Sequence, residues 1–191
     1  MPGRSCHEAV EKYLEPIFNA VRILVSNAQL IGGPNFYNRQ VGQSGYWRLG
    51  GEDGLRLRSN DGRDRTFYAE QAYTIIESEP DRREAGKFRV TTDEYAYNLT
   101  VDGIFVWKMH WHPEGRSEEW RAHYHLTCGE IAGNHLPSGR HTIEDAVEWC
   151  IRFGAQPEVS EERWADVLTM SKKKHELHRG WSGTPERLKN P

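Results

Sequence analysis

Histidine is the residue type whose spacing in this chain points most directly to chemistry. Six of the nine histidines fall between His110 and His141. Four of the six form two His-x-His pairs, His110 with His112 and His123 with His125. Alternate residues of a strand point to the same face of a sheet, so each pair shares one face of its own strand. The two pairs lie on neighbouring predicted strands, and we expect the four imidazoles to cluster.

The register of these two strands follows from the residues that alternate with the histidines. We expect His112 to lie opposite His123, and His110 opposite His125. The reverse face would then carry an aromatic layer, formed by Phe105, Trp107, Met109 and Trp111 against Trp120, Tyr124 and Leu126. A slip of one residue would move every side chain to the other face, so we expect the aromatic layer to fix this register.

Two tyrosines of the preceding predicted strand are expected beside the histidines. Asp102 and Gly103 are typical of a two-residue hairpin turn. A tight turn there would bring Tyr95 alongside His110, and Tyr97 alongside Lys108.

Acid–base catalysis is the first chemistry that this cluster suggests. Histidine has an unperturbed pKa near ~6.5, so one imidazole can act as a base while its neighbour acts as an acid. The reaction would be metal-independent cleavage of RNA, by attack of a 2′-hydroxyl on the adjacent phosphate. His123 and His125 would be base and acid, with His110 and Tyr97 as alternates, and Lys108 would stabilise the developing charge.

Metal ligation is the second chemistry, because opposed Cβ atoms in a sheet lie only ~4.5–5.5 Å apart. The ligands of a divalent metal such as zinc or manganese would be His110, His112, His123 and His125. His123 and His125 followed by Glu130 are similar to the first metal motif of cupins, and residues 137–141 to the second. A third hypothesis is a non-catalytic module whose sheet binds a protein partner.

Four arginines flank a predicted turn at Asn60-Asp61-Gly62. A two-residue turn there would place Arg58 opposite Arg63 and Arg56 opposite Arg65, all four on one surface. Acidic residues lie close by in the sequence, namely Glu52, Asp53, Asp61 and Asp64. This composition favours a solvated hairpin face that neutralises itself, and the alternative is a site that binds RNA phosphates.

The surrounding elements predict an α+β fold in one domain over residues 1–180. An N-terminal helix within 1–31 begins at Ser5, which forms a capping box with Glu8. A twisted antiparallel sheet, a meander in its later part, follows over 40–130. Two helices within 142–178, the first capped by Thr142 and Asp145, pack on its aromatic face. Residues 181–191 are predicted to be a flexible tail.

Composition excludes several classes of protein. The 191 residues carry a formal net charge of −3, so RNA binding would need a local basic patch. Apolar runs are far shorter than the ~18 residues of a membrane span. Three cysteines, Cys6, Cys128 and Cys150, form no Cys-x-x-Cys motif, which indicates reduced thiols and a cytoplasmic protein rather than a secreted disulfide scaffold.

The segment over about 95–151 resembles the TumE-like family of small toxins from bacterial toxin–antitoxin pairs. Shared features are Tyr95-x-Tyr97, the Asp-Gly turn, the His123-x-His125 motif and a helix that opens with Thr-x-Glu-Asp from Thr142. The middle residue of the His motif is often basic in that family and is Tyr124 here. The resemblance implies a toxin that cleaves RNA through His123 and His125. It also implies a cognate antitoxin as partner, such as a helix-turn-helix protein, and is compatible with a homodimer.

Overall fold

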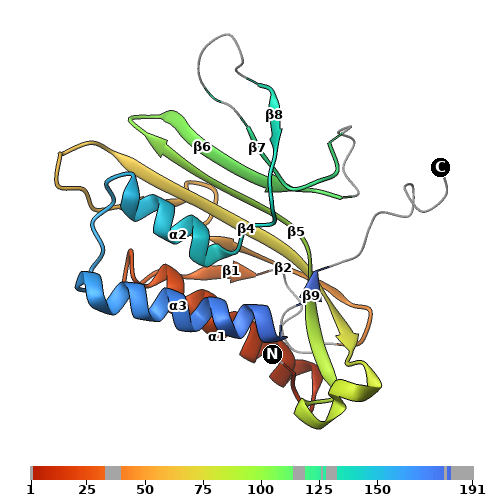
Figure 1. Cartoon of the computed structure of the whole chain (residues 1–191). Helices are drawn as coiled ribbons and strands as arrows, with labels where there is room; N and C mark the ends of the chain where they lie inside the picture. The colour runs from red at the N-terminus through yellow and green to blue at the C-terminus, as the bar shows by residue number, and fades with distance from the viewer. Residues whose placement is uncertain are drawn as a thin grey trace.

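The computed structural model describes residues 2–32, 40–113, 119–125, 127, 133–178 and 180–181. Within these residues the chain forms the α+β fold that the sequence predicts, an open antiparallel sheet with helices on one face (Figure 1). The helices are α1 (Cys6–Val21), α2 (Ile143–Arg152) and α3 (Glu161–His178), with a short 3-10 helix η1 (Pro80–Ala85). No helix in this part of the chain is long and apolar enough to cross a membrane.

The sheet is built around two long central strands. Its strands are β1 (Leu30–Gly32), β2 (Ser44–Leu49), β3 (Leu55–Leu57), β4 (Arg65–Glu77), β5 (Phe88–Val101), β6 (Ile104–Trp111), β7 (His123–His125), β8 (His135–Pro137) and β9 (Gly180–Trp181). They are ordered β1-β2-β4-β5-β6-β7-β8, while β3 pairs with β4 and β9 pairs with β5. The predicted meander is confirmed as β5-β6-β7.

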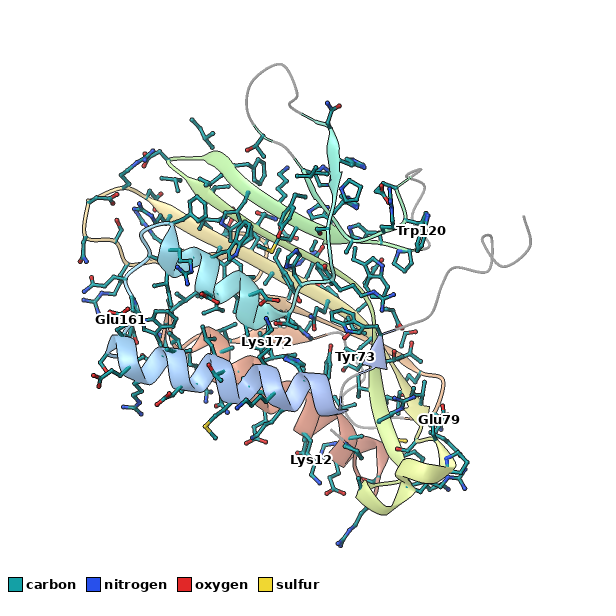
Figure 2. All side chains as sticks on the ribbon, in the orientation of Figure 1. Lys12, Tyr73, Glu79, Trp120, Glu161 and Lys172 are labelled. Atoms are coloured by element: carbon teal, nitrogen blue, oxygen red, sulfur yellow. The ribbon has the colours of Figure 1, made fainter. Side chains whose placement is uncertain are left out.

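The core lies between the sheet and the helices. Every second residue of β4, from Arg65 to Ile75, is buried on the side that faces the helices. Helices α1 and α2 contact β5 directly, whereas α3 packs mainly against α1 and α2 and forms an outer layer. Figure 2 shows Tyr73 inside the molecule, where its ring lies 5.2 Å from that of Tyr13 on α1.

Both predicted helix starts are present. Ser5 accepts a hydrogen bond from the backbone of Glu8, and Thr142 forms the full capping box with Asp145. The first helix ends at Val21, and the chain then turns into strand β1, which the apolar spacing through Ala28 had not indicated.

The predicted flexible tail contains a residue that packs in the sheet. Trp181 belongs to β9, which runs parallel to β5, and its ring lies 5.9 Å from that of Tyr95 and 5.4 Å from that of Trp111. Residues 182–191 of this segment lie outside the described residues.

A β-bulge corrects the prediction for the hairpin at Asp102-Gly103. The turn forms as expected, since Val101 pairs with Ile104. Val106 is then an extra residue in β6, because Thr100 pairs with Phe105 but Leu99 pairs with Trp107. One extra residue exchanges the two faces of the strand beyond it.

The bulge separates the tyrosines from the histidines. Tyr95 and Tyr97 pair with Trp111 and Met109, and both tyrosine rings are buried on the helix side of the sheet. The prediction that they lie beside His110 and Lys108 is therefore wrong. Phe105, expected in the aromatic layer, is instead 39% exposed.

The arginine hairpin also differs from its prediction by one residue. Arg56 pairs with Thr66, and Leu57 pairs with Arg65, because residues 58–64 form a wider loop than a two-residue turn. Arg65 consequently faces the interior and is 4% exposed, while Arg56, Arg58 and Arg63 are exposed. The four arginines do not line one surface.

Three of these arginines have acidic partners. Arg56 pairs with Asp64 at 2.9 Å, Arg63 with Asp102 at 2.8 Å, and Arg65 with Asp61 at 2.6 Å. Arg65 also donates to the carbonyl of Phe153, which ties the loop to the end of α2. This arrangement fits the hypothesis of a self-neutralised hairpin, and a role of these arginines in binding RNA stays a prediction.

Candidate metal centre

Strands β6 and β7 bring two histidines directly opposite each other. His110 pairs with His123, and Lys108 pairs with His125. The expected pairs, His112 with His123 and His110 with His125, are wrong by two residues. A shift of two leaves every side chain on its expected face, so the aromatic pattern could not distinguish the two registers.

The histidines lie on the face of the sheet away from the helices. Met109 and Trp111 alternate with them and are buried in the core. Tyr124, between the two histidines of β7, stacks on Trp149 of α2 with ring centroids 5.4 Å apart. The prediction that the histidines project opposite the aromatic layer is confirmed for His110, His123 and His125.

These three residues form a compact group, which we call the three-histidine cluster. The Nε2 atoms of His123 and His125 lie 3.2 Å apart. The rings of His110 and His125 have centroids 4.5 Å apart. One ring nitrogen from each of the three residues lies within 4.8 Å of the other two.

The backbone fixes the tautomer of His123. Its Nδ1 lies 2.8 Å from the carbonyl oxygen of Arg121, so Nδ1 carries the proton and donates it there. Arg121 is held in turn by Glu119, whose carboxylate accepts from both its side chain and its backbone. The lone pair of His123 therefore lies on Nε2 and is directed toward His125. His123 is only 2% exposed, so its ring is packed among neighbouring side chains.

His110 has a buried ring nitrogen without a described partner. Its Nε2 is shielded from solvent and makes no hydrogen bond to any described residue. An unsatisfied buried polar atom costs about 1–3 kcal/mol, so this nitrogen is a candidate for binding a group supplied from outside the chain.

Two further histidines border the cluster. His135 of β8 stacks on His123 with ring centroids 4.5 Å apart, and meets His125 at 4.5 Å. His135 was not among the predicted site residues, because the predicted sheet ends at residue 130. The density of histidines over 110–141 was nevertheless a sign that His135 belongs to the site. His112, a predicted ligand, lies at the end of β6 with its Nδ1 3.3 Å from Glu94.

Burial and mutual repulsion keep the cluster neutral. Burial, followed by the charges of neighbouring histidines and of Lys108, lowers the pKa of His110 to about 3 and that of His125 to about 4. Burial also lowers the pKa of His123. Near pH 7 the three imidazoles are therefore in the neutral form that binds metals.

These pKa values predict that the metal-free protein loses stability in acid. His110 and His125 bind protons more weakly in the folded chain than in the unfolded chain, where their pKa is ~6.5. Their contribution is fully present above pH ~6.5 and is lost as the pH falls toward the folded values. The groups that face them are His112, His123, His135 and Lys108. Urea unfolding at pH 7 and pH 5 should give a lower midpoint at pH 5.

A double variant isolates the two histidines in this experiment. The difference between the urea midpoints at pH 7 and pH 5 should shrink in the variant that carries both His110→Gln and His125→Gln. It should persist in His7→Gln, which removes an exposed histidine of α1. Equal differences in the wild type and the double variant would contradict the prediction.

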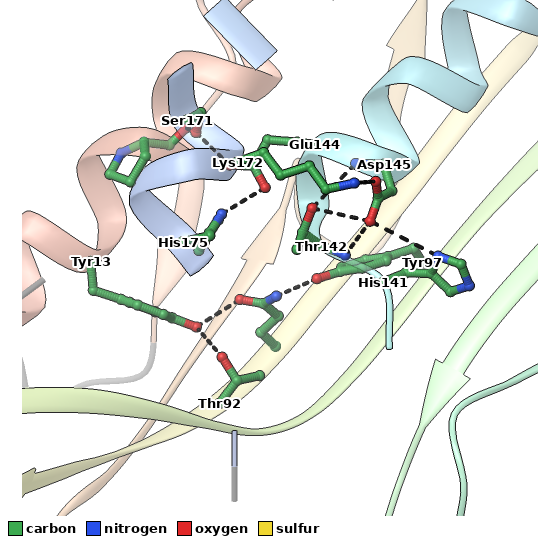
Figure 3. Close-up of polar contacts among 12 residues, drawn as sticks. Tyr13, Thr92, Tyr97, His141, Thr142, Glu144, Asp145, Ser171, Lys172 and His175 are labelled. Carbon is green, nitrogen blue, oxygen red and sulfur yellow. Dashed lines mark hydrogen bonds and ion pairs between the residues drawn. The ribbon is translucent and has the colours of Figure 1, made fainter. Parts of the chain in front are cut away.

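The remaining predicted site residues lie elsewhere. Tyr97 is on the helix side, where its hydroxyl accepts from Gln71 and burial raises its pKa (Figure 3). His141, from the cupin-like second segment, lies against Tyr124 and 3.9 Å from Asp145, so it is on the opposite face from the cluster. Glu130 lies outside the described residues.

Comparison with known proteins does not assign this site to a family. No protein-family model, curated protein or solved structure matches the chain. The resemblance to the TumE-like family stays a prediction, and the site is interpreted from its own geometry.

Proposed function

We propose that the protein binds one zinc ion through His110, His123 and His125. The observation that carries this proposal is the approach of two ring nitrogens, with 3.2 Å between Nε2 of His123 and Nε2 of His125. Zinc binds histidine nitrogens at ≈ 2.0–2.1 Å in tetrahedral sites, which separates two ligand nitrogens by about 3.3 Å. The pair is therefore already spaced as two ligands of one ion.

The protonation of the pair supports the same proposal. Because His123 donates through Nδ1, its Nε2 can only accept. Without a cation, the contact is favourable only if His125 carries its proton on the facing nitrogen. A divalent cation between the two would be favourable for both lone pairs, and it would also offer a partner to the ring nitrogen of His110 that lies within 4.8 Å of them.

The ligand type favours zinc over manganese and magnesium. Imidazole suits zinc, copper, iron and nickel, whereas manganese and magnesium prefer oxygen ligands. A zinc ion with three protein ligands keeps a fourth position open and lowers the pKa of a bound water to ≈ 7, which supplies a nucleophile near neutral pH.

The protein positions and orients the three histidines before a metal binds. Adjacent strands fix the spacing of His110 and His123, and the Arg121 carbonyl holds His123 in the tautomer that ligation needs. Removing a hydrogen bond that orients a metal ligand commonly lowers metal affinity by 10–100-fold. His135 forms one wall of the cluster by stacking on His123.

The geometry supports acid–base cleavage of RNA less well than it supports metal binding. That mechanism needs one protonated imidazole near pH 7, and the lowered pKa values of His110 and His125 leave both neutral. Its alternate group, Tyr97, lies on the other face of the sheet. Toxin activity, an antitoxin partner and RNA cleavage stay predictions, and RNA cleavage that persists in EDTA would support them against the zinc proposal.

Calorimetric titration of the full chain tests the proposal. Protein treated with a chelator and then dialysed should bind one equivalent of zinc, and should not respond to magnesium under the same conditions. The absence of zinc uptake, or equal uptake of both ions, would overturn the proposal.

A further inference from the structure

We propose that the metal site binds a small oxyanion, a carboxylate or a phosphate, with Lys108 as its second anchor. This inference rests on the proposed zinc site and assigns its ligand class. The juxtaposition that carries it is a lysine beside the three-histidine cluster that pairs with no acidic residue in the described part of the chain.

Lys108 is positioned beside the cluster by the strand register. It pairs directly with His125 across β6 and β7, and it lies on the same face as His110, two residues along its own strand. The charge of Lys108 acts on both histidines, since it contributes to lowering the pKa of each.

The bulge in β6 holds the ammonium group in place. By turning Phe105 to the outer face, the bulge puts its ring under Lys108, whose Nζ lies 3.4 Å from the ring centroid. A cation on an aromatic face is stabilised without being neutralised. Within the described part of the chain, no carboxylate forms an ion pair with Lys108. Two described acids contact residues around the cluster, and they do so away from Lys108: Glu94 lies against His112, and Glu119 pairs with Arg121.

The charge balance of this arrangement favours an anion. Three neutral imidazoles leave the charge of a divalent ion uncompensated, and Lys108 adds a further positive charge. Bound cations are often the largest local charges in a site, and an anionic ligand at the open coordination position would be attracted by both. A carboxylate or phosphate offers one oxygen to the metal and another to the ammonium group, whose three donors suit such a point contact.

Cobalt substitution allows metal binding and anion binding to be measured separately. Cobalt(II) placed in the full-length protein gives visible absorption bands that change when a ligand enters its coordination shell. The bands themselves report the proposed metal site. Inorganic phosphate and acetate, titrated separately, should each change the bands with a saturable dependence.

Lys108→Met should weaken phosphate binding about tenfold, the effect of losing one charged hydrogen bond, with cobalt uptake unchanged. Lys108→Arg should retain most of the affinity. The matched control is Lys87→Met, because Lys87 also lies on a phenylalanine ring, that of Phe88 at 5.1 Å, but at the start of β5. This control should bind phosphate like the wild type.

The outcomes separate the two proposals. If no cobalt bands appear, the zinc proposal fails. If the bands appear but neither anion changes them, or if Lys108→Met and Lys87→Met bind phosphate equally, the oxyanion proposal fails alone. A change that requires an oligoribonucleotide, with none from phosphate or acetate, would also overturn it and would favour RNA as the ligand.

Discussion

Replacing His123 with alanine should lower the affinity for zinc at least a hundredfold. The substitution removes the ligand whose tautomer and position are fixed by the Arg121 carbonyl, and it leaves two histidines in place of three. Loss of a group that merely orients a ligand already costs 10–100-fold, so loss of the ligand should cost more. Competition with a zinc-binding dye would measure the change.

Because His123 is buried, a second variant is used to distinguish loss of zinc binding from loss of folding. His125→Ala removes a half-buried ligand of the same cluster and should produce a similar loss. The control is His141→Ala, which removes a histidine from the opposite face, where it lies against Tyr124. If His141→Ala weakened zinc binding as much as His125→Ala, the three-histidine cluster would not be the site.

Replacing Glu144 with alanine should cost about 3–5 kcal/mol of folding stability, because it removes a buried carboxylate and leaves its partners His175 and Ser171 buried without it. Glu144 is 2% exposed and His175 is 5% exposed, with Oε2 and Nδ1 2.7 Å apart. Ser171 donates to the other carboxylate oxygen and lies 3.1 Å from the carbonyl of Pro16 (Figure 3). These contacts join α1, α2 and α3, so their loss should loosen the whole helix layer.

Urea unfolding can measure this effect against a control on the same helix. Glu148→Ala removes a more exposed glutamate, which pairs with Arg152, and should cost no more than ~1 kcal/mol. Glu144→Gln retains an acceptor for Ser171 and should cost less than Glu144→Ala. Equal losses in Glu144→Ala and Glu148→Ala would show that the buried pair contributes no special stability.

The fold class was predictable because its signals are local. Alternation in β5 and β6, the Asp-Gly turn and the Thr142 cap each depend on neighbouring residues. The burial of Glu144 was not predictable, since an acidic residue in the first turn of a helix ordinarily faces solvent and favours the helix dipole. Its partner His175 lies on another helix, 31 positions further on.

The candidate site was predictable in its residues and less so in its geometry. The His-x-His spacing assigned His123 and His125 to one face, and the structure agrees. The bulge at Val106 could not be inferred, because one extra residue leaves no trace in the alternation on either side of it, and it moved Tyr97 to the other face. The pairing of β7 with β8 places His135 opposite His125, ten positions earlier in the chain, and the density of histidines over 110–141 was its signal in the sequence.

X-ray absorption at the zinc edge of the loaded protein tests the central claim most directly. The zinc proposal predicts a first shell of nitrogen or oxygen atoms near 2.0–2.1 Å, with the outer-shell scattering of three imidazole rings. His125→Ala should reduce the imidazole contribution to two rings. A sulfur scatterer near 2.3 Å, or a shell without imidazole scattering, would place the ion elsewhere and contradict the account.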